Sequence, residues 1–216
     1  MPFEIHGISF SGFARNDLEK LICLDYAGRV SWLKHRFELV FLAPFRKFLA
    51  MDGPDCYIWL CTVSLLCTAV EALADFEFRG AGMHKFSAFV EKYFSDDFKS
   101  AHLHLDDPKP GKNAASTPAE HLYKYFRCGL AHSFCIEWGG ILHREDGAPS
   151  YLFQRNPIPD RNSLGIIPRE FVDDFLSAVE RFFDSALAWD PGTSSRTKFE
   201  RQFQEVFLLC SKPPEP

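Results

Sequence analysis

The sequence predicts an all-α fold, a bundle of about five or six helices with a small β-hairpin insertion. Apolar residues recur at helical spacing along most of the chain. The segments with strand character are too few to form a layer of their own. Phenylalanine supplies much of the apolar surface, with 23 Phe against 6 Tyr and 4 Trp. Because aromatic rings bury large areas, a substantial core can form without disulfides or a metal ion.

The first half of the chain supplies three predicted helices. After an irregular segment over residues 1–28, a helix over 29–50 is expected to kink or restart at Pro44, because proline removes a backbone donor. A long helix over about 55–78 follows. Its apolar residues cover nearly the whole circumference, which is typical of the innermost helix in a bundle. The apolar residues of the shorter third helix are Phe86, Phe89, Val90, Tyr93 and Phe94.

A strong helix start follows a loop over residues 100–116 that is rich in Pro, Gly, Asp and Lys. Thr117 is a capping residue, Pro118 takes the first helical position, and Glu120 is placed to close a capping box. We expect this helix to end within residues 132–134.

Short strands are expected after that helix, within an insertion over about 134–167. Residues 134–138 and 141–143 flank a Gly-Gly turn and predict a hairpin. Residues 151–153 and 164–167 are candidates for further strands, separated by a loop rich in Pro and Asn.

Two amphipathic helices complete the bundle. Pro168 opens the first, which ends near Trp189. The second carries Phe199, Phe203 and Phe207 at helical spacing. We therefore predict a single helical domain over residues 29–210, preceded by the irregular segment 1–28 and followed by a tail over 211–216.

Net charge and targeting signals bear on whether the chain binds nucleic acid and whether it is directed to a membrane. The net charge of −5 argues against indiscriminate binding of nucleic acid, whose affinity comes from neutralising phosphates. Nucleic-acid chemistry would therefore be local or depend on a partner. The first residues show neither the basic region nor the clean apolar region that is typical of a signal peptide. The most apolar stretch, 57–70, is shorter than the ~20 residues that span a bilayer. We expect a cytoplasmic protein without a membrane segment.

No metal or cofactor is expected. The seven cysteines lack zinc-finger spacing and suit a reducing compartment, mostly as small core residues. The loop before Thr117 contains His102, His104, Asp106 and Asp107, which invite a metal hypothesis. A solvated loop is the better interpretation of these four residues, because nothing in the sequence gives them a fixed geometry.

The helix that begins at Thr117 carries the segment with the most chemical character, Tyr-Lys-Tyr-Phe-Arg-Cys-Gly-Leu-Ala-His-Ser over 123–133. Arg127 and His132 form an R-x4-H pattern on it. Here the sequence resembles the HEPN superfamily of all-helical domains, whose signature is an arginine followed four to six residues later by a histidine. The order of elements over about 29–189 is also similar.

The geometry of a helix separates the two motif residues. Five steps place His132 about 140° from Arg127 and ~7.5 Å along the axis. Leu122, Phe126 and Gly129 cluster on one side and should face the core, so the motif residues flank the other side. One straight helix cannot bring both side chains to a single substrate atom.

A second copy of the chain can complete such a site. Lys124, Cys128 and Ala131 lie between the two motif residues, and the small Cys128 and Ala131 permit close approach of a two-fold related helix. This agrees with what the resemblance implies, a composite site at a homodimer interface.

The resemblance implies metal-independent cleavage of RNA, in toxin–antitoxin, stress-response or phage-defence systems. RNA carries its own nucleophile, the 2′-hydroxyl, beside the scissile phosphate. Arg127 would stabilise the phosphate charge, and His132 would act as general acid or base or orient water. The expected products are a 2′,3′-cyclic phosphate and a 5′-hydroxyl.

Two positions depart from the pattern of active relatives. Many of them have a polar residue directly after the arginine, where this chain has Cys128, a weak hydrogen-bonding group. Toxin members paired with nucleotidyltransferase antitoxins often read R-x4-H-x-Y, whereas this chain has Phe134 without a hydroxyl. An antitoxin or other protein partner stays among the expected partners, but not through that mechanism.

Further residues are candidates for the surroundings of the site. Glu71 on the long helix is a candidate partner that orients Arg127, although a solvent-facing glutamate is the commoner case. Tyr123, Lys124 and Ser133 are candidate neighbours. Alternatively, Arg127 is a surface ion-pair residue and His132 only favours a helix C-terminus. The sequence thus leaves two hypotheses: an active ribonuclease, or an inactive HEPN-like module that binds a nucleotide or a protein.

Overall fold

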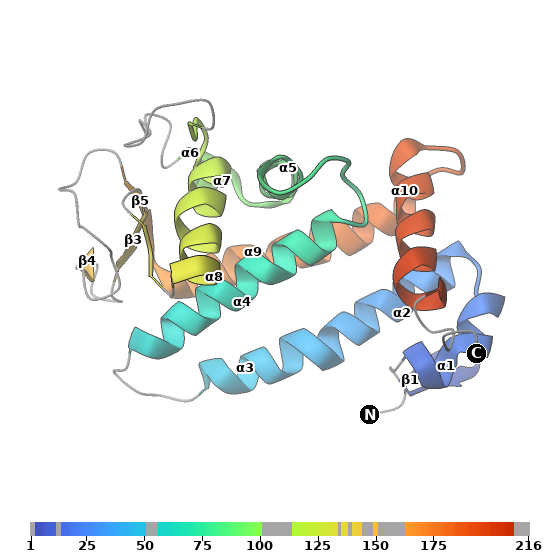
Figure 1. Cartoon of the computed structure of the whole chain (residues 1–216). Coiled ribbons are helices and arrows are strands. Elements are labelled where there is room, and N and C mark those ends of the chain that lie inside the picture. Colours follow the sequence, from blue (N-terminus) through green and yellow to red (C-terminus); the bar gives the residue numbers. More distant parts are fainter. Residues whose placement is uncertain are drawn as a thin grey trace, which may run out of the picture. The chain divides into compact units, whose positions relative to one another are not determined.

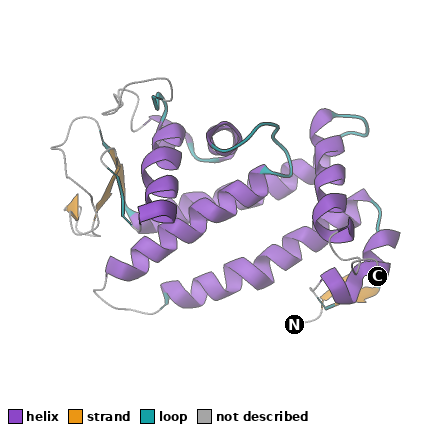
Figure 2. Cartoon of the chain, viewed as in Figure 1, coloured by secondary structure: helices purple, strands orange, loops and turns teal. Residues whose placement is uncertain are grey.

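The computed structural model describes residues 3–11, 14–50, 56–100, 114–133, 135–137, 140–143, 149–150 and 163–209. The chain is mostly helical and carries two small β-sheets (Figure 1, Figure 2). The coarse prediction of a helical protein with a minor β component is therefore confirmed.

The chain folds as two compact units. Unit 1 comprises Met1–Gly53, Asp75–Glu77 and Phe182–Pro216, and unit 2 comprises Pro54–Ala74 and Phe78–Arg181. The single domain predicted over 29–210 spans parts of both units.

Unit 1 begins with a β-hairpin, so the prediction of an irregular segment over 1–28 is wrong. β1 pairs antiparallel with β2, and His6 and Gly7 form a two-residue turn with φ of 51° and 77°. The strands are only three residues long, and histidine is not a typical residue for such a turn. The elements of unit 1 are β1 (Phe3–Ile5), β2 (Ile8–Phe10), α1 (Ala14–Cys23), α2 (Tyr26–Phe37), η1 (Glu38–Leu42), α3 (Ala43–Leu49), α10 (Ser194–Phe203) and η4 (Gln204–Leu209).

The predicted break at Pro44 takes the form of a change in helical winding. α2 continues into the π-helical η1, where the amide of Ala43 donates to the carbonyl of Glu38, and α3 begins at Ala43. Proline offers no amide hydrogen and crowds the carbonyl four residues before it. The wider π-helical turn before Pro44 accommodates both effects, and the helix restarts as predicted.

Aromatic rings build the core of unit 1. Trp32 is fully buried and packs edge-on against Phe203 and Phe207, with ring centroids 5.7 and 5.0 Å apart. Phe199 is also fully buried and stacks on Phe203. The phenylalanines that the sequence placed on one face of the last helix therefore do line the core.

Unit 2 holds the long central helix and the motif segment. α9 begins in unit 2 and ends in unit 1, close to its predicted bounds. The elements of unit 2 are α4 (Cys56–Ala74), α5 (Met83–Tyr93), α6 (Asp96–Ser100), α7 (Pro118–His121), η2 (Leu122–Cys128), α8 (Gly129–Ser133), β3 (Gly140–His143), β4 (Pro149–Ser150), β5 (Leu164–Ile166) and the first part of α9 (Pro168–Ala188).

α4 is not buried on all sides, which corrects the prediction from its composition. Val63, Leu66 and Val70 are fully buried. One side of the helix is exposed, and Leu65 on that side has 44% of its surface accessible. The exposed residues recur at helical spacing and are Cys61, Leu65, Thr68 and Ala72.

The insertion forms a three-stranded sheet in the order β4-β3-β5, with β3 and β5 parallel. The predicted hairpin over 134–143 lies partly outside the described residues. Gly140 begins β3, and its amide donates to the Glu137 carbonyl at 2.9 Å, the hydrogen bond of a four-residue turn. Ile136 forms an isolated bridge. The strand predicted at 164–167 is confirmed as β5, whereas 151–153 lie outside the described residues.

The cysteines are less buried than predicted. Of the five whose side chains the structure describes, all are free thiols, but only Cys67 is buried. Cys23 and Cys61 are exposed, and Cys128 and Cys135 are half-buried. No helix in the described part of the chain is long and apolar enough to cross a bilayer.

Candidate functional site

The motif segment is one continuous helix over 118–133, made of α7, η2 and α8 in unit 2. Its capping follows the prediction with one difference. The Thr117 hydroxyl accepts from the Glu120 amide at 3.2 Å. The Glu120 carboxylate reaches past Thr117 and accepts at 2.7 Å from the amide and the hydroxyl of Ser116. The helix ends at Ser133, within the predicted range.

The middle of this helix is wound as a π-helix, which the sequence did not predict. η2 includes Arg127 and ends at Cys128. Because a π-helical turn holds more residues than an α-helical turn, the 140° separation expected for a regular helix does not apply to Arg127 and His132. Such π-helical turns inside α-helices occur frequently at functional sites.

The buried and exposed sides of the motif helix agree with the prediction. Leu122, Phe126 and Gly129 are buried. Arg127 is half-buried, and His132 is exposed. The motif side chains therefore avoid the core and are accessible from solvent.

The sheet and the chain after α8 pack closely on the buried side of the motif helix. A Cβ at Gly140 in β3 would lie 2.5 Å from Cε2 of Phe126, so any larger residue there would force the buried ring to shift. A Cβ at Gly129 would lie 2.5 Å from the carbonyl oxygen of Cys135. The Glu137 amide also donates to the Tyr125 carbonyl at 3.0 Å. Cys135, Glu137 and Gly140 thus pack against the buried side of the motif helix.

Glu71 holds the guanidinium of Arg127. Both Nε and Nη2 of Arg127 donate to the single oxygen Oε2 of Glu71, at 2.9 and 2.6 Å. The side chains are 26% and 20% exposed. Partial burial acts to lower the pKa of Arg127, but the hydrogen bonds and charge of Glu71 outweigh it and raise the pKa. Arg127 therefore stays charged at any working pH.

The ring of Tyr123 covers a second side of the same guanidinium. Cζ of Arg127 lies 5.5 Å from the ring centroid. Burial is the main cause that raises the pKa of Tyr123, so this phenol is neutral near pH 7. Nη1 of Arg127 makes no hydrogen bond or ion pair with the residues that the structure describes. The guanidinium thus keeps free N–H donors beside two occupied ones.

The remaining predicted residues surround this centre unequally. His132 forms no hydrogen bond or ion pair with any described residue. Lys124 is half-buried, with Nζ 5.3 Å from the centroid of the Tyr125 ring. Cys128 and Ser133 are half-buried on the same helix. The structure brings together Glu71, Tyr123 and Arg127, and it leaves His132 at the accessible end of the helix.

A metal centre is not built from the described residues. No group of three His, Cys, Asp or Glu side chains within the described ranges is placed to hold an ion. The loop residues His102, His104, Asp106 and Asp107, and also Phe134, lie outside the described residues.

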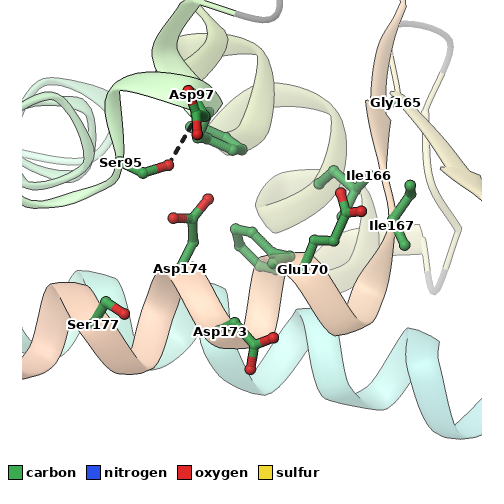
Figure 3. A pocket seen from close by; sticks show the side chains of 11 residues that line it. Ser95, Asp97, Gly165, Ile166, Ile167, Glu170, Asp173, Asp174 and Ser177 are labelled. Atoms are coloured by element: carbon green, nitrogen blue, oxygen red, sulfur yellow. Dashed lines mark hydrogen bonds between the residues drawn. The ribbon is translucent and has the colours of Figure 1, made fainter.

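A surface pocket of about 480 Å³ in unit 2 has the wrong charge for RNA. Its lining includes four carboxylates and, within the described residues, no Lys, Arg or His. Figure 3 shows Asp174 directed toward Asp97 and Ser95, whereas Asp173 points away from them. Phosphate groups would be repelled here. The carboxylates belong to Asp97, Glu170, Asp173 and Asp174.

Comparison with known proteins adds no identification. The chain matches no family model, no curated protein and no solved structure.

Proposed function

We propose that this chain is a HEPN-type, metal-independent endoribonuclease that cleaves RNA through a 2′,3′-cyclic phosphate at a composite site of a homodimer. One observation carries the proposal. Arg127 is held by Glu71 through Nε and Nη2, its Nη1 makes no hydrogen bond with any described residue, and the exposed His132 follows on the same helix. An oriented arginine from one copy and an accessible histidine from the other suit phosphodiester cleavage at a composite site.

Each group has a defined task in the proposed reaction. The 2′-oxygen of the ribose attacks the adjacent phosphorus, a 2′-O–P bond forms, and the bond from phosphorus to the 5′-oxygen breaks. His132 takes the proton of the 2′-hydroxyl, and a water molecule donates a proton to the leaving 5′-oxygen. Arg127 donates from Nη1 to the phosphate oxygens as their negative charge grows.

Two copies of the chain are part of this proposal. The side of the motif helix between Arg127 and His132 carries the half-buried Cys128 and the exposed Ala131, whose small side chains permit close approach of a two-fold related helix. The resemblance suggests a role in a toxin–antitoxin or defence system, with an antitoxin or another protein as regulator.

A second candidate function is a catalytically inactive HEPN-like module that binds a nucleotide or a protein partner. The ion pair with Glu71 favours this candidate, because it already neutralises the charge of Arg127. The net charge of −5 and the weakly polar Cys128 point the same way.

RNA cleavage in EDTA separates the two candidates. We expect the wild-type chain to cleave a mixed-sequence RNA, leaving 2′,3′-cyclic phosphate ends that mass spectrometry identifies. His132→Ala should lower the rate by about a hundredfold or more, because it removes the proton-transfer group. Arg127→Ala should lose cleavage while the oligomeric state is retained.

A matched control is His35→Ala, which removes an exposed histidine of unit 1. It should cleave at the wild-type rate. Absence of cleavage by the wild type, or equal rates for the wild type and His132→Ala, would refute the catalytic assignment.

A further inference from the structure

The contact between Arg127 and Glu71 leaves one motion of the guanidinium open. Nε and Nη2 both donate to Oε2, so the two hydrogen bonds converge on one atom. A pair of bonds to two carboxylate oxygens would hold the plane of the guanidinium. Two bonds to one oxygen let the plane tilt about that oxygen, and the tilt changes where Nη1 points.

The ring of Tyr123 lies where it limits this tilt. Tyr123 precedes Arg127 by four residues in η2, and its ring centroid is 5.5 Å from Cζ of Arg127. The attraction between a guanidinium and an aromatic face favours this placement. A carboxylate and a ring together constrain the guanidinium from two sides.

α5 in turn holds the ring of Tyr123. Phe86 packs against it with ring centroids 5.3 Å apart at an angle of 60°. The hydroxyl occupies the space beside Gly82, where a Cβ would lie only 2.9 Å from the phenolic oxygen. Gly82 also has a φ of +55°, which side-chain-bearing residues rarely adopt. Glycine at this position therefore leaves the room that the tyrosine fills.

We propose that Tyr123 is the positioning residue of Arg127: its ring, held by Phe86 and by the space beside Gly82, sets the plane of the guanidinium so that Nη1 faces the substrate phosphate. This assignment rests on the proposed function for its catalytic consequence. The structural part, that the ring restricts the guanidinium, is testable without any substrate.

The ring and the hydroxyl predict different effects. Tyr123→Leu removes the aromatic face and should lower kcat by about tenfold to a hundredfold, as expected for misplacement of a catalytic group, with little change in KM. Tyr123→Phe keeps the face and should restore kcat to near the wild-type value. The matched control is Glu91→Gln, an exposed residue near the other end of α5, which should behave as wild type.

Side-chain NMR gives a readout that does not need activity. The Nε–H signal of Arg127, assigned by its loss in Arg127→Lys, should exchange slowly with water in the wild type and in Tyr123→Phe. It should exchange at least about tenfold faster in Tyr123→Leu, because the guanidinium can then leave Glu71 more often. Equal exchange in the wild type and folded Tyr123→Leu would overturn the proposal.

A second pair of variants covers the case in which Tyr123→Leu fails to fold. Gly82→Ala should displace the hydroxyl and speed up the same exchange. Adding Tyr123→Phe to Gly82→Ala should slow it again, because the phenolic oxygen is gone. Failure of this rescue would count against the proposal.

The two proposals can fail separately. If the wild type does not cleave RNA but the exchange rates follow the expected order, the ribonuclease assignment is wrong and the positioning contact stands. If the wild type cleaves RNA and Tyr123→Leu keeps its kcat, Tyr123 has no positioning role.

Discussion

At the scale of single residues, Glu71 sets the position of the Arg127 guanidinium through two hydrogen bonds. In sequence, a glutamate on an apolar helix is most simply explained by contact with solvent. The structure instead pairs it with Arg127 across 56 positions of the chain, at 2.6 and 2.9 Å. A contact between residues this far apart depends on how α4 and the motif helix pack.

The first prediction concerns this ion pair. Glu71→Gln keeps the size of the side chain but removes the charge that Arg127 faces. Unit 2 should lose about 1 to 2 kcal/mol of stability, since the pair is charge-assisted and mostly shielded from water. If the chain is a ribonuclease, its kcat should also fall.

Urea unfolding of Glu71→Gln and of the exposed Glu91→Gln measures the difference. An equal free energy of unfolding for the two variants would show that the ion pair contributes nothing to stability.

The second prediction concerns alkaline pH and Tyr26 in unit 1. Its hydroxyl donates to the Ala186 carbonyl at 2.8 Å. Burial raises the pKa of Tyr26, an effect that the nearby Arg196 only partly opposes. The folded state favours the neutral phenol, so this stabilisation is present below pH ~10 and is lost as the pH rises above it.

Tyr26→Phe should therefore be about 1 kcal/mol less stable than the wild type at pH 7, the cost of one hydrogen bond. The difference should shrink above pH 10. Denaturant unfolding of both proteins at pH 7 and above pH 10 measures this difference in the free energy of unfolding. A difference that does not change with pH would contradict a stabilising role of the neutral Tyr26 phenol.

At the scale of elements, the motif helix is specified by contacts on both of its sides. Its start at Thr117 follows from capping chemistry and was predicted. Its π-helical middle was not predicted, because winding depends on what packs against the helix. Gly129 shows the difference: in a helix, glycine is normally a weak choice, but here the carbonyl oxygen of Cys135 occupies the place of a Cβ.

The third prediction is that Gly129→Ala destabilises the chain. Helix propensity alone would favour alanine by about 1 kcal/mol. Overpacking against the carbonyl of Cys135 and the amide of Glu137 should cost about 1 to 3 kcal/mol, because backbone atoms cannot move aside easily. Ala131→Gly, at an exposed position of the same helix, should cost about 1 kcal/mol from propensity alone.

Thermal or urea unfolding of both variants shows whether each substitution raises or lowers the stability of the chain. A Gly129→Ala variant that is more stable than the wild type would show that the chain after α8 does not lie against the helix as described.

At the scale of the whole molecule, the proposed site needs two copies of the chain. The fourth prediction is complementation between inactive variants. If Arg127 of one copy acts with His132 of the other, a mixture of Arg127→Ala and His132→Ala contains mixed dimers with one intact site. That mixture should regain part of the wild-type cleavage, although each variant alone is inactive.

Sedimentation of the wild type should show a species of twice the 24.7 kDa chain mass, and cleavage per chain should fall on dilution. A monomer that cleaves RNA at full rate, or a mixture without activity, would contradict a composite site.

Much of the fold was accessible from the sequence because it depends on local chemistry. Apolar spacing predicted the helices that begin at Pro118 and Pro168, and the capping residues at Thr117 predicted where one begins. Three-residue strands carry too little pattern, so β1 and β2 were missed. The pairing of β3 with β5 was also out of reach, since it joins segments more than 20 residues apart.

By itself, the sequence determined the helical class, the start of the motif helix and the presence of Arg127 and His132 on it. Those features follow from propensity, periodicity and capping, which act over a few residues. Only the tertiary structure decided that Glu71 pairs with Arg127, that the Tyr123 ring lies over the same guanidinium, that α4 keeps one side exposed, and that Gly82, Gly129 and Gly140 give room to neighbouring atoms. These features depend on how side chains and segments pack against one another, which propensity and capping do not determine.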